Sequence, residues 1–373
     1  MLGGGIPIGK IFGIAIRLNY SWFIIFALVT WALTVNYFPS IHPPWNLATR
    51  LIAGLLTSFL LFGSLLVHEL MHSVVAQAAG IPVRSVTLFI FGGVAQISKE
   101  PQKPKVELRI ALAGPLASLV LGGIFLVIWV VTQGASDVVS AIVFWLGWTN
   151  ILLAVFNLLP GFPLDGGRVL RATLWWLKHD LSKATRIASN VGRGVGYIFI
   201  FGGIWLIFQG LWFNGLWLAF IGWFLDHAAA GSYRQVALQD ILRGHTASEV
   251  LTREYSTIPP ELTIQQLVNE QILTTGVRCF PVVADNRALG LVTLHDIKTI
   301  PRDLWNTRKV SEAMTPLAKI QSATPQEDLA TVLQILTEND INQVPVIEDG
   351  HIVGMVGRDN VLSFVRIRTE LGV

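Results

Sequence analysis

The sequence has few charged residues and almost no cysteine. Of its 373 residues, 14% are Asp, Glu, Lys or Arg, whereas 52% are hydrophobic. This balance excludes an ordinary soluble globular protein and predicts a chain that crosses a membrane several times. Cys279 is the single cysteine. A disulfide within the chain and a zinc site made of several thiolates are therefore both excluded.

Neither sign of charge predominates: the chain has 27 Lys and Arg and 24 Asp and Glu, so its formal net charge is only +3. No basic stripe interleaved with aromatic residues is present, so nucleic acid is not the expected partner. The first apolar run lacks a small-residue cleavage pattern after it, and we expect it to stay as a membrane anchor. Most charged residues follow residue 232. This shift predicts a membrane domain over residues 1–231 and a soluble part after it.

The membrane domain contains apolar runs of the length needed to cross a bilayer. Before the first run, alternation around residues 8–10 and 13–16 predicts two short strands at a membrane edge. Lys and Arg gather before the first span and after the second and fourth, which predicts a multi-pass protein of the cell membrane with both termini in the cytoplasm. About six spans are expected, near Tyr20–Phe38, Leu51–Ala79, Val106–Thr132, Val138–Leu159, Ile187–Phe208 and Leu211–Ala230.

A motif of the form H-E-x-x-H lies in the second predicted span, at His68, Glu69 and His72. On a helix the two histidines lie on one face, where they can hold one metal ion. Glu69 then stands beside the ion and can take a proton from water. Ionisable side chains are rare at membrane depth unless they serve a function. The alternative is a helix end whose histidines pair with backbone or lipid headgroups.

A second stretch with polar residues at its ends spans residues 157–167. Its two prolines interrupt the fourth predicted span, and it ends in Asp165-Gly166-Gly167. A broken helix at membrane depth is tolerated where it lines a cavity. Catalytic zinc sites usually have three protein ligands, so Asp165 is a candidate for the third. The alternative is a loop in which Asp165 caps the following helix, expected over Val169–Leu177.

Between these stretches, residues 83–98 alternate in hydrophobicity around Gly92-Gly93, which predicts a β-hairpin at membrane depth. An unpaired strand edge in a membrane must find a partner or line a cavity. A peptide segment added to this edge as a further strand would be held extended. A hairpin that only packs against the helices is the alternative.

The polar part of the chain repeats itself. Residues 247–252 match 310–315, and the strand-like runs near 280 and 290 match those near 344 and 354. A period of about 64 residues suits a duplicated small α/β module rather than a solenoid. We expect a helical linker over 232–245 and two modules over 246–304 and 305–373.

Together these motifs resemble the site-2 protease family of intramembrane zinc metalloproteases. The resemblance covers nearly the whole chain and includes residues 91–95 and 113–118 besides the two motifs above. It implies one Zn²⁺ ion held by His68, His72 and Asp165, with Glu69 as general base. It also implies that Asn157 lies near the bound substrate, where its amide could steady the peptide carbonyl, although a helix-stabilising role fits as well. In this family a membrane re-entrant β-loop is assigned to this stretch. A substrate helix, unwound for hydrolysis, would then be held extended beside Phe91, Gly92 and Gly93.

The repeated modules resemble a tandem CBS pair, found in one branch of that family. Such pairs often bind adenine nucleotides, and the resemblance implies that Thr293 and Asp296 would contact the ligand. The second copy has Gly357 and Asn360 at the matching positions. A structural role, or a role in homodimer formation, is an equal alternative for the pair.

The favoured hypothesis is a zinc endopeptidase that cleaves a transmembrane substrate protein within the lipid bilayer. A transporter or channel regulated by its CBS pair, with the same polar residues as an ion path, is the rival. Hydrolysis is favoured because Glu69 is superfluous in a static metal site and because the other predicted spans contain few charged residues. An inactive relative is a third alternative, which the intact set of key residues disfavours.

Overall fold

The computed structural model describes residues 5–42, 44–90, 92–97, 101–134, 136–253, 255–284, 287–339 and 341–371. Phe91, one of the predicted substrate-binding residues, lies outside the described residues. The chain separates into two units, residues 1–236 and 237–373. The domain limits expected at residues 231, 245 and 304 stay predictions.

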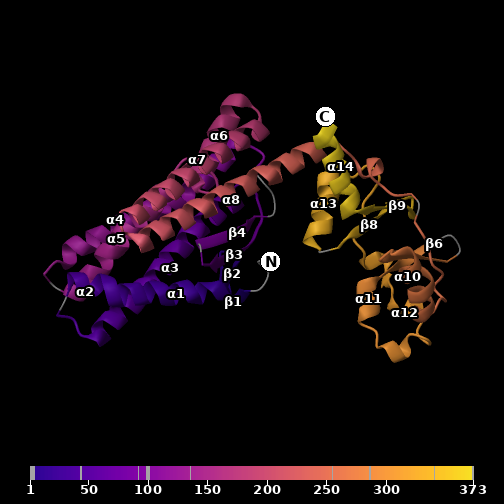
Figure 1. Ribbon diagram of the computed structural model, residues 1–373, viewed down its shortest axis with the longest axis horizontal. Coiled ribbons are helices and arrows are strands. Elements are labelled where there is room, and N and C mark those ends of the chain that lie inside the picture. The colour runs from indigo at the N-terminus through magenta and orange to yellow at the C-terminus, as the bar shows by residue number, and fades with distance from the viewer. Residues whose placement is uncertain are drawn as a thin grey trace. The chain divides into compact units, whose positions relative to one another are not determined.

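Helices dominate the first unit (Figure 1). Within the described residues, five helical segments are long and apolar enough to cross a membrane. The first combines α1 (Tyr20–Ala32), a π-helical turn (Leu33–Tyr37) and α2 (Phe38–Ile41). The others are α3 (Leu47–Ala78), α4 (Pro104–Thr132), α5 (Asp137–Asn157) and α7 (Leu181–Phe208).

Two further helices complete this unit. The sixth predicted span falls within α8 (Trp212–Leu242), which is helical but is not among those five segments, so its membrane crossing stays a prediction. A shorter helix, α6 (Asp165–Lys178), follows the interrupted region predicted after the fourth span. It begins at the candidate metal ligand Asp165 and therefore four residues earlier than the expected helix.

One sheet joins two separate parts of the first unit, in the order β1-β2-β3-β4. The predicted hairpin is present as β3 (Val83–Phe89) and β4 (Gly92–Ile97), which pair antiparallel. The two predicted N-terminal strands are β1 (Gly5–Ile11) and β2 (Ile14–Asn19), and β2 pairs parallel to β3. Buried residues of β2 and β3 pack with α3 and α4 in one apolar cluster. The sheet thus lies beside the helix that carries the H-E-x-x-H motif (Figure 1).

The loop between α5 and α6 packs backbone against backbone on its neighbours. A Cβ atom on Gly167 would lie 2.2 Å from the carbonyl carbon of Gly161, and one on Gly192 of α7 would lie 2.1 Å from the carbonyl oxygen of Phe162. The amide of Phe162 donates a hydrogen bond of 3.2 Å to the carbonyl of Ala188. Glycine is required at these positions because any side chain would push the loop away from the helices.

The second unit contains two similar α/β modules. Their cores are separate clusters, one around Phe280, Val282 and Val292, the other around Val344 and Val346 with Leu242 at the end of α8. Strands β5, β6 and β7 form one sheet, and β8 and β9 form another. The strands are β5 (Cys279–Ala284), β6 (Arg287–Thr293), β7 (Thr315–Pro316), β8 (Gln343–Glu348) and β9 (His351–Gly357).

Short helices surround these strands. The α-helices are α9 (Ile264–Gln266), α10 (Leu273–Thr275), α11 (Leu294–Lys298), α12 (Val310–Ala313), α13 (Leu329–Glu338) and α14 (Arg358–Leu371). A π-helical turn spans Leu267–Ile272, and 3₁₀ turns span Ala247–Glu249, Arg302–Leu304 and Leu317–Lys319. The repeat predicted from the sequence is therefore a structural repeat.

Glycines allow α7 and α8 to approach closely. A Cβ on Gly203 would lie 2.5 Å from the carbonyl oxygen of Gly215 and 2.6 Å from the amide nitrogen of Ala219. On the adjacent Gly202, the nearest atom would be Cδ2 of Leu218 at 3.6 Å, an ordinary contact. Small residues at such contacts are typical of helix pairs in membranes, where van der Waals packing replaces the hydrophobic effect.

We therefore expect Gly203→Ala to destabilise the protein by about 1–3 kcal/mol, because the backbone atoms it meets cannot move independently. Gly202→Ala is the matched control and should be neutral or slightly stabilising, since alanine favours the helix. Thermal unfolding of both variants in detergent tests this difference. Equal melting temperatures would contradict the close contact between α7 and α8.

Candidate active site

Helix α3 positions the H-E-x-x-H motif. The side chain of Asn46 caps the helix by accepting a hydrogen bond from the amide of Thr49 at 2.8 Å. Apolar residues then continue the helix without a break to the motif. His68 and His72 are 2% and 4% exposed, so both imidazoles lie inside the bundle.

Helix α4 fixes the orientation of both imidazole rings. Nδ1 of His68 lies 2.9 Å from the hydroxyl of Ser118, and Nδ1 of His72 lies 2.6 Å from the carbonyl oxygen of Ile110. A carbonyl can only accept, so Nδ1 of His72 carries the proton. Nε2 of a neutral His72 is then free to bind a metal, and such outer hydrogen bonds are typical of metal-ligating histidines.

Asp165 meets the two histidines from α6. Its Oδ2 atom lies 3.2 Å from Nε2 of His68 and 3.1 Å from Nε2 of His72. Leu164, not Asp165, is the N-cap residue of α6, and it makes no side-chain capping bond. The carboxylate therefore faces the histidines, contrary to the alternative in which it caps the helix.

The three donor atoms have the spacing that a zinc ion requires. Ligand atoms placed tetrahedrally at about 2.0–2.1 Å from zinc stand about 3.3 Å from one another. The two Nε2 atoms are 3.3 Å apart, and their distances to Oδ2 of Asp165 are 3.2 and 3.1 Å. Two nitrogens and one carboxylate oxygen also match the donor set of catalytic zinc sites. The residues present thus fit the metal.

Two glycines touch this cluster with their backbones. A Cβ on Gly114 of α4 would lie 2.2 Å from Nε2 of His72 and 2.6 Å from Nε2 of His68. A Cβ on Gly93 of β4 would lie 2.3 Å from Cγ of Glu69. The absence of a side chain at Gly114 leaves room for the rings, and β4 runs directly against the candidate general base.

Glu69 projects from the same turn of α3 as the histidines but is not part of the donor cluster. Its carboxylate is half-buried beside Gly93 and interacts electrostatically with Arg168 of α6 and with His72. Arg168 follows Asp165 by one helical turn, so α6 brings a positive charge as well as a carboxylate to the site.

Two other predicted residues of the membrane unit, Asn157 and Gly92, are not members of the donor cluster. Asn157 is the last residue of α5, and its Nδ2 atom donates to the carbonyl of Leu153 at 3.0 Å. This bond matches the helix-stabilising alternative, and its catalytic role stays a prediction. Gly92 begins β4 with a φ of 130°, a backbone conformation that favours glycine.

Ser118, Gly114 and the Ile110 carbonyl were not assigned roles from the sequence. Gly114 and Ser118 lie within residues 113–118, a mostly small stretch that also matches the family pattern. In a membrane bundle, such a run indicates a place where another helix approaches closely. The backbone carbonyl of Ile110 has no sequence signal at all.

In the first CBS-like module, Thr293 and Asp296 bind each other at the start of α11. The amide and hydroxyl of Thr293 donate to Oδ2 of Asp296 at 2.8 and 2.7 Å. In the second module, the amide of Gly357 donates to Oδ1 of Asn360 at 2.9 Å. Both modules therefore keep the bond from the backbone amide to the side chain three residues later, whereas only Thr293 also accepts a bond from the amide of Asp296.

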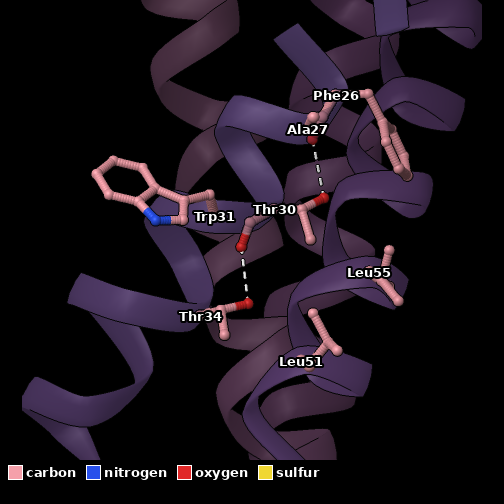
Figure 2. A pocket seen from close by; sticks show the side chains of 7 residues that line it. All are labelled: Phe26, Ala27, Thr30, Trp31, Thr34, Leu51 and Leu55. Carbon is pink, nitrogen blue, oxygen red and sulfur yellow. Dashed lines mark hydrogen bonds between the residues drawn. The ribbon is translucent and has the colours of Figure 1, made fainter. Parts of the chain in front are cut away.

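An apolar pocket between α1 and α3 is separate from the metal-ligand cluster (Figure 2). The hydroxyls of Thr30 and Thr34 point into their own helix and donate to the carbonyls one turn earlier. Leu55, which lines the pocket, precedes His68 by 13 residues, or about 20 Å along α3. The pocket is lined by Phe26, Ala27, Thr30, Trp31, Thr34, Leu51 and Leu55.

A helix-borne H-E-x-x-H motif joined by a carboxylate inside an apolar helical bundle defines a metalloprotease of the membrane-embedded class. A model of peptidase family M50 matches residues 56–137 and 132–202, and a CBS domain model matches residues 247–302 and 310–367. The Synechocystis protein sll0528, named as a zinc metalloprotease, is 36% identical over 97% of this chain and 96% of its own length.

The chain is also similar to archaeal sequences and structures. Zinc metalloprotease MJ0392 of Methanocaldococcus jannaschii is 28% identical over 97% of both chains. The solved site-2 protease from the same organism is 30% identical over 62% of this chain and 95% of its own, with a TM-score of 0.42. The chain belongs to peptidase family M50, as a zinc metalloprotease of the site-2 protease type with a C-terminal CBS pair. Membership in a peptidase family favours hydrolysis over the transporter hypothesis.

We expect Gly114→Ala to weaken zinc binding by at least tenfold, about the effect of other changes next to metal ligands. The new methyl group would overlap both ligand nitrogens and displace the rings. Gly123→Ala on the same helix is the matched control, because a Cβ there meets no atom within 4 Å. Zinc content after dialysis against a metal buffer measures the effect, and an equal content in both variants would contradict it.

Proposed function

We propose that this protein is an intramembrane endopeptidase that hydrolyses a peptide bond within a transmembrane segment of a substrate protein, as in regulated intramembrane proteolysis. The observation that supports this most is the convergence of His68, His72 and Asp165 among apolar, membrane-length helices. Hydrolysis at that depth requires a polar site shielded from lipid, which buried ligands on packed helices provide.

His68, His72 and Asp165 would hold one zinc ion in this proposal. Bound there, zinc would supply Lewis-acid activation of the attacking water and the scissile carbonyl. Glu69 accepts the proton of the water and later gives it to the leaving amine, because its carboxylate stands beside the ligands without joining them. Arg168 adds positive charge near Glu69, which would favour the negative charge that develops on the carbonyl oxygen.

The substrate would bind as an added strand on β4. In the described part of the chain, no strand pairs with the outer edge of β4. Main-chain hydrogen bonds along this edge would hold the unwound substrate extended. Gly93 would then bring its peptide bond close to Glu69, because no side chain separates the two. Asn157 is proposed to contact the substrate carbonyl from the end of α5.

The proposed setting is the cell membrane, with both termini in the cytoplasm. The Lys and Arg residues of the loops support this orientation through the positive-inside rule. The CBS pair would then lie on the cytoplasmic side, where it can meet nucleotides or form a homodimer. The pair, which matches a CBS domain model over residues 247–302 and 310–367, is proposed as the regulatory part of the protease.

Glu69→Gln should reduce the cleavage rate by about 10²–10⁴-fold while zinc stays bound, because the amide cannot accept the proton. The assay is cleavage of a fluorescently labelled transmembrane peptide in detergent or liposomes, with zinc content measured in the same preparation. Cleavage at the normal rate would remove Glu69 from the mechanism.

Asp165→Ala is the contrasting variant in the same experiment. It removes a proposed ligand, so both zinc occupancy and cleavage should fall. Full occupancy in Asp165→Ala would assign the third ligand to another residue. The two variants together separate loss of chemistry from loss of metal.

For the CBS pair, we propose an adenine nucleotide as ligand, with Thr293 and Asp296 among its contacts. Calorimetry on the full-length protein in detergent with ATP, ADP and AMP tests this. Asp296→Ala should weaken binding by at least tenfold, the loss of about one charge-assisted hydrogen bond. Asn360→Ala is the matched control, because it removes the equivalent cap from the second module.

The control separates a folding effect from a binding effect. Loss of a helix cap lowers stability in both variants, whereas loss of a ligand contact weakens binding in Asp296→Ala alone. If no nucleotide binds at millimolar concentration, the sensor proposal is wrong. The pair would then serve as a docking or dimerisation module.

A further inference from the structure

The proposed mechanism does not use the most deeply buried charges of the membrane unit. Glu107 of α4 is 1% exposed and Arg171 of α6 is 7% exposed. Nε of Arg171 donates to Oε1 of Glu107 at 2.7 Å, and a second guanidinium nitrogen donates to the same oxygen. Burying such a pair is expensive, and well-packed apolar residues often stabilise a protein as much or more. The pair therefore calls for an explanation other than stability.

Glu107 lies on the face of α4 that holds the histidines. Ile110, Gly114 and Ser118 follow it at intervals of three, four and four residues, which places all four on one stripe of the helix. Ile110 and Ser118 bind the Nδ1 atoms of His72 and His68, and Gly114 touches both rings. Glu107 thus extends this stripe by one turn beyond the last contact with the histidines.

Arg171 lies on the helix that begins with Asp165. The two residues are six positions apart, or about 9 Å along α6, and about 120° apart around its axis. The guanidinium of Arg171 also lies over the ring of Phe162, 5.1 Å from its centre, in the loop that leads into α6. Asp165 thus contacts α3, whereas the ion pair attaches α6 to α4 from a different face of α6.

We propose that the Glu107–Arg171 ion pair positions Asp165 by fixing the depth and rotation of α6 against the histidine-holding stripe of α4. An apolar contact would let α6 slide or rotate, because dispersion forces have little directional preference. A fork-shaped guanidinium that makes two hydrogen bonds to one carboxylate restricts both motions. Both residues are positioning residues, and the inference rests on the proposed zinc site.

The test compares the wild type with three variants of the full-length protein in detergent, each stripped of metal and titrated with Zn²⁺ and with Co²⁺. Glu107→Gln leaves Arg171 buried without its counter-charge and is expected to lower stability. Glu107→Gln/Arg171→Gln removes both charges and keeps two groups that can hydrogen-bond, so its melting temperature should recover. The matched control is Arg193→Gln/Asp226→Asn, which removes the 2.8 Å ion pair between α7 and α8, helices that contribute no ligand to the cluster.

In the double variant at residues 107 and 171, the dissociation constant for Zn²⁺ should rise at least tenfold. The visible absorption of bound Co²⁺ should change in position or intensity, because the carboxylate ligand is displaced. The turnover number for the labelled transmembrane peptide should fall while KM stays unchanged. The control variant should match the wild type in metal affinity and in the Co²⁺ spectrum.

Three outcomes overturn the inference. A double variant with normal stability, metal affinity and Co²⁺ spectrum shows that the ion pair does not position Asp165. An equal loss of metal affinity in the control variant shows a general effect of removing ion pairs. Failure of the wild type itself to bind Zn²⁺ would instead refute the proposed zinc site, and the inference with it.

Discussion

The structure of the membrane unit depends on the meeting of three donor atoms within one small volume. Nε2 of His68, Nε2 of His72 and Oδ2 of Asp165 come from two helices that are separated by more than 90 residues in the sequence. Burying such polar atoms is unfavourable unless each finds a partner. Helix α4 supplies partners for the outer nitrogens of both rings. The inner atoms have the spacing that fits a metal ion as their shared partner.

Small residues make this meeting sterically feasible. In a bilayer, helices associate through close packing rather than through the hydrophobic effect. A glycine therefore favours association, because it lets two backbones approach and gain van der Waals contacts. Gly114 leaves space for the imidazole rings against α4. Gly167 and Gly192 let the loop before Asp165 pack against the helices, and Gly93 lets β4 contact Glu69. Each of these glycines lies where backbone meets either a ligand, the candidate base or the segment that delivers the third ligand.

Much of the site was predictable because its signals are local. The spacing of His68 and His72 predicts one helical face, and the prolines before Asp165 predict the break that α6 follows. Contacts between distant segments were not predictable. The parallel pairing of β2 with β3 joins residues about 70 positions apart, and neither strand's alternation encodes its partner. Likewise, Glu107 and Arg171 are charged residues near span ends, where a sequence suggests solvent rather than each other.

The two CBS-like modules show how local geometry and chemistry can diverge. Thr293 with Asp296 and Gly357 with Asn360 start equivalent helices by the same hydrogen bond to a backbone amide. A helix start needs only an acceptor oxygen, which Asn and Asp both supply. A positively charged ligand group would distinguish them, because only Asp carries charge. The fold of the pair is thus preserved by a requirement that both copies meet, whereas any ligand recognition through Asp296 would be asymmetric between them.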